Sequence, residues 1–336
     1  MKGILTAPRA IFTIVLMSLL AISKPALASE GGEKEALNVS EIAMHHVMDD
    51  HQWAFTHSLV MPLPIIVYSQ ERGLEMFSSS NFVDEHHQPK EYNGYKLEHN
   101  HITLNGQKVL DFSITKNVGM LFIVTAILIF LLLRTAAGYK KNKGKAPSGI
   151  QSFIEVIVVF VKDEVVKPNV GPRYERYLPY LLTLFFFILA ANLMGLVPGS
   201  GNLSGNIAVT SCLALLTFII TNVNGNKNYW SHILWTPGVP LPLRFIILPV
   251  EIIGIFTKPF SLMIRLFAAI TAGHIVLLSL LSLTFIFHSW GAGIGASLFV
   301  VFINLIELLV AGIQAYVFTL FTSLYIGMAI EEHDHH

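Results

Sequence analysis

The feature that most restricts how this chain can fold is a long apolar stretch at residues 245–287. As a helix it would be about 65 Å long, roughly twice the 30 Å hydrocarbon core of a bilayer. It therefore either crosses a membrane twice or forms one strongly inclined helix, bent near Pro249 and Pro259. Residues 295–330 pose the same problem. Two such stretches predict a chain that folds inside a membrane.

Composition supports this interpretation. The chain is 53% hydrophobic and 13% charged, with a mean hydropathy of +0.59, whereas globular proteins carry about 25% charged residues. The formal net charge is zero, so there is no electrostatic argument for a nucleic-acid partner. The single cysteine, Cys212, excludes an internal disulfide and a cysteine metal cluster.

Residues 1–28 have the layout of a secretory signal peptide. Lys2 and Arg9 precede an apolar core at residues 10–22, and the segment ends in Ala26-Leu27-Ala28. The core is too short for a comfortable membrane span. We expect cleavage after Ala28 and a mature N-terminus outside the cytoplasm; the alternative is an uncleaved N-terminal anchor.

Residues 29–117 are polar and rich in histidine, which predicts a small extracytoplasmic domain. Its histidines are His45, His46, His51, His57, His86, His87, His99 and His101. They could bind zinc or copper, but their spacing matches no ligand motif, so a solvated domain without a metal site is favoured. The histidine-containing tail at 331–336 is likewise interpreted as a solvated segment without a metal site. Residues 96–104 and 107–114 alternate loosely around Asn105-Gly106, which predicts short strands joined by a tight turn.

The remaining chain predicts five membrane spans after removal of the signal peptide. The first, 118–138, is followed by Lys140 and Lys141, and positive residues mark the cytoplasmic side. The loop 139–176 contains an amphipathic helix at 149–168, and 177–224 forms a two-span hairpin around an uncharged external turn at 199–205. A cytoplasmic loop at 225–244 leads to a hairpin of two long, inclined helices at 245–330 and a cytoplasmic tail. The fold class is thus an all-α polytopic membrane protein with a small N-terminal domain.

The long hairpin carries ionisable residues where apolar ones are expected. On a helix, residues 7 and 14 apart differ by about 20° and 40°, so Glu251, Lys258 and Arg265 share one face, with His274 behind it. Glu307 and Gln314 share a face of the last helix. In an antiparallel hairpin, Arg265 would therefore approach Gln314, and His274 would approach Glu307.

These residue types suit proton transfer rather than hydrolysis. A guanidinium stays charged, whereas a carboxylate or an imidazole can titrate near neutral pH in apolar surroundings. Arg265 would be a fixed positive gate, and His274, Glu307 and Glu251 would exchange protons. The alternative is that these residues are buried structural pairs, as polar pairs in membranes often are.

Other functional classes have less support. The chain has no phosphate-binding Gly-Lys-Ser/Thr loop and no His-Glu-x-x-His motif. We therefore predict no catalytic site and no cofactor. The rival interpretation is a metal-cation transporter with a histidine-rich sensing domain outside the membrane.

The run from Ser261 to Phe267 (SLMIRLF), Gly273-His274, and Gln314-Ala315-Tyr316 after Glu307 resemble the signature of subunit a of F-type ATP synthases. The resemblance covers residues 118–330. It implies that Arg265 is the stator arginine, Gln314 its polar neighbour and Glu251 the acid of the cytoplasmic half-channel. His274 and Glu307 match an acid–histidine pair that the family carries in either order.

The resemblance also implies the surroundings of the chain. These are the F0 sector in the bacterial inner membrane, a rotor c-ring, the peripheral-stalk subunit b and, indirectly, the F1 sector. The sequence departs from the family at Ala269, where an asparagine is usual, so the external half-channel is expected to be lined differently. The candidate lining residues are Ser261, Thr271 and Asn304. The coupled ion, H⁺ or Na⁺, is left open.

Overall fold

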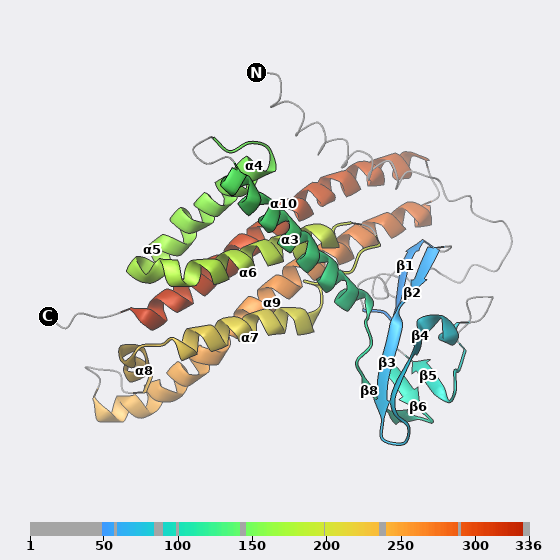
Figure 1. The fold of residues 1–336 in the computed structure, drawn as a ribbon, viewed down its shortest axis with the longest axis horizontal. Helices are drawn as coiled ribbons and strands as arrows, with labels where there is room; N and C mark the ends of the chain where they lie inside the picture. Colours follow the sequence, from blue (N-terminus) through green and yellow to red (C-terminus); the bar gives the residue numbers. More distant parts are fainter. Residues whose placement is uncertain are drawn as a thin grey trace.

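The computed structural model describes residues 49–56, 59–83, 90–98, 101–141, 146–197, 199–234, 240–287 and 290–331. The expected signal peptide, six of the eight histidines of the N-terminal region and residues 332–336 lie outside the described residues. A bundle of long helices makes up most of the molecule, with a small β domain at one end (Figure 1). The prediction of a mostly helical membrane protein with strands near its N-terminus is confirmed.

The two long apolar stretches each form one continuous helix. Helix α9 is Leu241–Phe287, with 47 residues, and α10 is Trp290–Ile330, with 41 residues. They run side by side in opposite directions along the molecule (Figure 1). Pro249 and Pro259 lie inside α9 without ending it. The structure therefore favours one long helix over a stretch that turns back within the membrane.

Among the described residues, four helical segments are long and apolar enough to cross a membrane. They are α3, Lys116–Lys141; the run Ile150–Gly195, which ends in α6, Tyr174–Gly195; and most of α9 and of α10. A fifth is added if α7, Ile207–Val223, is counted together with α8, Lys227–Leu234, to which it is joined by a bend of 101°. Four to five spans agree with a polytopic membrane protein.

The segment predicted as an amphipathic surface helix packs more deeply than expected. Helix α4, Ile150–Phe160, continues through a π-helical turn, Val161–Val166, into the short α5, Lys167–Val170. The turn places fully buried valines against the bundle. At Gly327 of α10, a Cβ atom would collide with the backbone oxygen of Asn169. A glycine therefore permits this close approach, which helical spacing alone did not indicate.

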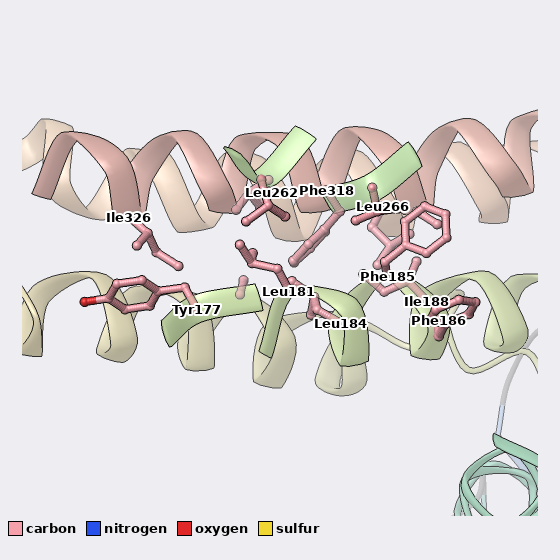
Figure 2. Close-up of a cluster of buried hydrophobic side chains, with 14 of the residues drawn as sticks. Tyr177, Leu181, Leu184, Phe185, Phe186, Ile188, Leu262, Leu266, Phe318 and Ile326 are labelled. Atoms are coloured by element: carbon pink, nitrogen blue, oxygen red, sulfur yellow. The ribbon is translucent and has the colours of Figure 1, made fainter. Parts of the chain in front are cut away.

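The main core lies where α6 meets α9 and α10. Leu262 and Leu266 of α9 and Phe318 of α10 are no more than 2% exposed, and they face side chains of α6 such as Leu181 (Figure 2). Burying each large apolar side chain contributes roughly 1.5–3 kcal/mol when the alternative is water. This packing fixes the rotation of α9 about its axis and so sets where Arg265 points.

The β domain consists of short antiparallel strands. The strands are β1 Gln52–Thr56, β2 Leu59–Pro62, β3 Pro64–Ser69, β4 Gly73–Ser78, β5 Tyr95–Glu98, β6 His101–Leu104, β7 Gln107–Lys108 and β8 Leu110–Asp111. They form the pair β1-β2 and the three-stranded sheets β4-β3-β8 and β5-β6-β7. The short 3₁₀ helix η1, Ser79–Phe82, follows β4.

The predicted turn at Asn105-Gly106 is confirmed. Both residues have positive φ, 50° and 80°, and Leu104 pairs with Gln107 across them. The predicted strand 107–114, however, breaks after Lys108. Its continuation β8 pairs with β3, because the chain must leave the β5-β6-β7 sheet to enter α3.

Polar contacts connect the β domain to the bundle. The carboxylate of Asp49 accepts hydrogen bonds from the Thr115 hydroxyl at 2.8 Å and the Asn117 N–H at 3.0 Å, at the start of α3. The Trp53 indole N–H donates to the carbonyl oxygen of Gly199 at 2.8 Å. The domain is therefore held against both α3 and the 199–205 turn.

Candidate functional site

The ionisable residues of α9 are spread along its length. At 1.5 Å per residue, Arg265 is about 21 Å from Glu251 and about 13 Å from His274 along the helix axis. All three side chains are half-buried. The distance from Glu251 to His274 is thus comparable to the thickness of a hydrocarbon core, with Arg265 between them.

Arg265 is held by an aromatic ring of α10. The centre of its guanidinium lies 4.3 Å from the centroid of the Phe321 ring, a distance at which the ring face attracts a cation. Gln314 lies on the same helix and is half-buried. No hydrogen bond joins Arg265 to Gln314 within the described part of the chain. Sequence reasoning missed Phe321, although it lies seven residues after Gln314 and so shares its face.

His274 and Glu307 meet across the helix hairpin. Nδ1 of His274 lies 3.5 Å from Oε1 of Glu307, and Glu307 is only 7% exposed. A Cβ atom at residue 273 would lie 2.6 Å from the same oxygen. Gly273 therefore allows the carboxylate to come close to α9.

A buried pair of polar side chains lies one helical turn from Glu307. The Ser204 hydroxyl donates to Oδ1 of Asn192 at 2.5 Å, and Nδ2 of Asn192 donates to the carbonyl oxygen of Ala311 at 3.0 Å. Ala311 is one helical turn beyond Glu307. Sequence reasoning missed Asn192 and Ser204; an asparagine inside the apolar run 177–198 was the available signal.

The candidate lining residues differ in their surroundings. The Thr271 hydroxyl oxygen is buried and has no hydrogen-bond partner among the described residues. Ser261, Asn304 and Ala269 are half-buried. Thr271 is therefore the only one of the three candidate lining residues with a buried and unsatisfied polar atom.

A small cleft lies beside the part of α9 between Glu251 and Arg265. Its volume is about 20 Å³, which is enough for one water molecule. It is lined by Thr217, Phe218, Thr221, Asn222, Tyr229, Ile255, Lys258, Pro259 and Tyr325. Tyr229 donates to Oδ1 of Asn222 at 3.2 Å, and Glu251 is close enough for its charge to act on the Tyr229 phenol. The cleft is thus mainly apolar, with a few polar groups such as Tyr229 and Lys258 in its wall.

The histidine-rich region shows no grouping of ligands where the structure describes it. Of its histidines, His51 and His101 are described. Nε2 of His51 lies 2.8 Å from Oδ2 of Asp111, and His101 is exposed. Among the described residues, no three His, Cys, Asp or Glu side chains form a group that could hold a metal ion.

Comparisons with known proteins divide the chain in two. Residues 118–327 match the family model "ATP synthase A chain". Residues 42–117 match a domain of unknown function, DUF8433. The boundary lies at the start of α3.

Several curated proteins are similar over most of the chain. ATP synthase subunit a of Chloroherpeton thalassium is 40% identical over 87% of this chain and 78% of its own length. ATP synthase subunit a of Pelodictyon phaeoclathratiforme is 47% identical over 68% of this chain and 69% of its own length. ATP synthase subunit a of Anaeromyxobacter sp. is 37% identical over 92% of this chain and 75% of its own length.

Proposed function

The chain belongs to the ATP synthase A chain family, and on that premise we propose that it passes protons through two offset half-channels to the carboxylates of a rotor c-ring. As a family member it is a multi-pass membrane subunit of the ATP synthase, without a catalytic site of its own, and it assembles with other subunits of the complex. The metal-transporter alternative is not favoured.

Arg265 separates the two half-channels. The supporting observation is its place on α9, between Glu251 and the His274–Glu307 pair, with the guanidinium held over Phe321 at 4.3 Å. A guanidinium remains protonated at any physiological pH. It would force a ring carboxylate to release its proton and would prevent protons from passing directly between the half-channels.

The surface beside Arg265 suits a ring helix. Ala268 and Ala272 are exposed, and small residues let helices in a membrane approach closely. Ile264 and Phe260 continue the exposed apolar surface along α9. A ring helix passing here would bring its carboxylate within reach of the guanidinium.

Each half-channel has its own polar groups. Glu251 and the cleft lined by Lys258 and Tyr229 serve the cytoplasmic side. His274 and Glu307 serve the extracytoplasmic side, together with Thr271 and Asn304. Gln314 is the polar neighbour of Arg265, and Ser261 lines the path near Arg265. Moving one proton across 100 mV yields about 2.3 kcal/mol, so several protons must pass for each ATP formed.

The proposed setting is the bacterial inner membrane. The N-terminal domain lies outside the cytoplasm after removal of residues 1–28, and the C-terminus lies inside. The rotor ring contacts α9 and α10, and the peripheral-stalk subunit b and the F1 sector complete the assembly. The assignment of the sides follows from the lysines at the end of α3.

The test is the variant Arg265→Ala in the complete ATP synthase reconstituted in liposomes. We expect assembly to be normal and proton-driven ATP synthesis to be lost. Arg134→Ala is the matched control, because Arg134 also lies over a phenylalanine, Phe130, but at the end of α3. Normal synthesis by Arg265→Ala would refute the proposal.

A further inference from the structure

We infer that Asn202 is a positioning residue for His274, and that the N-terminal β domain holds Asn202 in place through the 199–205 turn. The inference rests on the proposed function, because it assigns a role within the extracytoplasmic half-channel. It gives the domain at residues 42–117 a part in proton transfer.

The Asn202 amide is buried and only partly hydrogen-bonded. The side chain is 7% exposed, and its Oδ1 accepts a hydrogen bond from the Gly205 N–H at 2.9 Å. Its Nδ2 is buried and has no hydrogen-bond partner among the described residues. Buried amide groups are normally satisfied, so an unpaired one requires an explanation. The turn uses the oxygen of this amide and leaves the nitrogen unused.

The Asn202 amide lies beside the small space at Gly195. A Cβ atom added to Gly195 would lie 3.5 Å from Oδ1 of Asn202 and 3.9 Å from Nε2 of His274. The amide and the imidazole therefore border the same small space, and residue 195 has no side chain to separate them. Asn202 thus lies on the Nε2 side of His274, while Nδ1 is 3.5 Å from Oε1 of Glu307.

The His274 imidazole has a different neighbour on the side of each ring nitrogen. The group on one ring nitrogen determines which nitrogen carries the proton and how the ring is oriented. Glu307 of α10 is the titratable group that faces His274. From α6 and the turn, Asn202 is the polar side chain that shares the space at Gly195 with His274. Asn192 and Ser204 form a separate hydrogen-bonded pair that ends on Ala311 of α10. A neutral amide beside Nε2 can fix the ring without adding a charge.

The 199–205 turn is itself supported by the β domain and by the start of α3. Trp53 of β1 donates to the carbonyl oxygen of Gly199 at 2.8 Å. A Cβ atom at Gly201 would lie 2.9 Å from Oδ1 of Asn117 and 3.2 Å from the backbone oxygen of Lys116. The turn is therefore confined between the β domain, the start of α3 and the His274 site. Gly199, which Trp53 contacts, is three residues before Asn202. A displacement of Trp53 would therefore be transmitted to Asn202 through the turn.

The test compares Asn202→Asp with Asn202→Leu in the complete ATP synthase in liposomes. ATP synthesis is measured at a fixed driving force while the pH on the N-terminal-domain side is varied from about 5 to 8, the range in which histidine titrates. The aspartate variant retains an oxygen for the Gly205 N–H, so the turn and the assembly are maintained. We expect the pH midpoint of synthesis in Asn202→Asp to move by about one unit, because a new carboxylate lies beside the imidazole.

The variant Asn202→Leu removes both the oxygen that accepts from the Gly205 N–H and the polar group beside His274. We expect Asn202→Leu to lower synthesis at least several-fold, whereas Asn224→Leu, the same change at the opposite end of α7, leaves it unchanged. If Asn202→Leu fails to assemble, the pH profile of Asn202→Asp alone tests the inference. A wild-type rate and pH profile in Asn202→Asp would overturn the inference. Normal synthesis in His274→Ala would instead contradict the proposed function of the half-channel.

Discussion

Glu307 comes within 3.5 Å of His274 only because the residue before the histidine has no side chain. A Cβ atom at 273 would lie 2.6 Å from Oε1 of Glu307 and 3.3 Å from its Cγ. Real Cβ contacts are not that short, so the carboxylate would have to move by nearly 1 Å. The glycine is thus part of the site, although it has no chemistry of its own.

We therefore predict that Gly273→Ala lowers proton-driven ATP synthesis by about tenfold or more, since misplacing a reacting group by about 1 Å can cost on the order of 10²-fold. The measurement is synthesis by the reconstituted complex at equal amounts of assembled enzyme. Gly254→Ala is the matched control on the same helix, because a Cβ atom there meets nothing within 4 Å. Equal loss in both variants would mean that the effect comes from helix α9 and not from Glu307.

Sequence reasoning found those site residues that are conspicuous by their charge. Arg265, His274 and Glu307 lie in apolar sequence, and helical spacing was enough to predict that the last two meet. Phe321 and Asn202 carry no such signal. One phenylalanine among many does not reveal which ring covers a cation, and an asparagine in a polar turn is ordinary. Only the packing of α6 against α9 and α10 shows where they point.

Among the elements, the strand β8 joins the β domain to the first membrane helix. Its Asp111 accepts a 2.8 Å hydrogen bond from His51, which precedes β1, and another of 2.8 Å from the Ser113 N–H. Burial tends to raise the pKa of the Asp111 carboxyl, but the hydrogen bonds from His51 and Ser113 outweigh it, and the pKa lies below its usual value. The folded domain therefore binds this proton less readily than the unfolded chain does.

The lowered pKa of Asp111 makes the stability of the β domain depend on pH. A lowered pKa contributes stability above the ordinary carboxyl value of about 3.9, and this contribution is lost as the pH falls through the lower, folded-state value. We predict that hydrogen exchange of residues 110–114, corrected for its intrinsic pH dependence, accelerates in the wild type as the pH drops below about 4. Asp111→Asn should already exchange faster at neutral pH and show less further change. A parallel pH dependence in both proteins would contradict this role of Asp111.

The sequence predicted the helices and hairpins better than their packing. The periodicity of residues 149–168 correctly indicated a helix, and Asn105-Gly106 correctly indicated a turn. The burial of Val161, Val165 and Val166 against the bundle was not predicted, because apolar residues that face lipid and those that face protein look alike in a membrane sequence. The pairing of β8 with β3 is a contact between distant segments, which no local pattern encodes.

At the scale of the whole molecule, the chain combines a membrane domain with a β domain that packs on the end of the bundle through Trp53 and Leu63. The two family matches meet at residues 117 and 118, where α3 has just begun. Trp53 crosses this boundary through its hydrogen bond to Gly199, and Asp49 binds Thr115 and Asn117 just before it. The domains are thus separate in sequence but joined at the end of the bundle that carries the His274 site.

This arrangement predicts that the β domain and the far end of α3 lie on opposite sides of the membrane. The chain has one cysteine, Cys212, so a Cys212→Ser background allows single reporters at Lys108 of β7 and Lys140 of α3, both exposed. In intact spheroplasts, a membrane-impermeant maleimide should label Lys108→Cys but not Lys140→Cys, because the lysines at the end of α3 are retained in the cytoplasm. In inverted vesicles the pattern should reverse. Labelling of both positions from the same side would rule out a single crossing by α3 and with it the assignment of His274 and Glu307 to the extracytoplasmic half-channel.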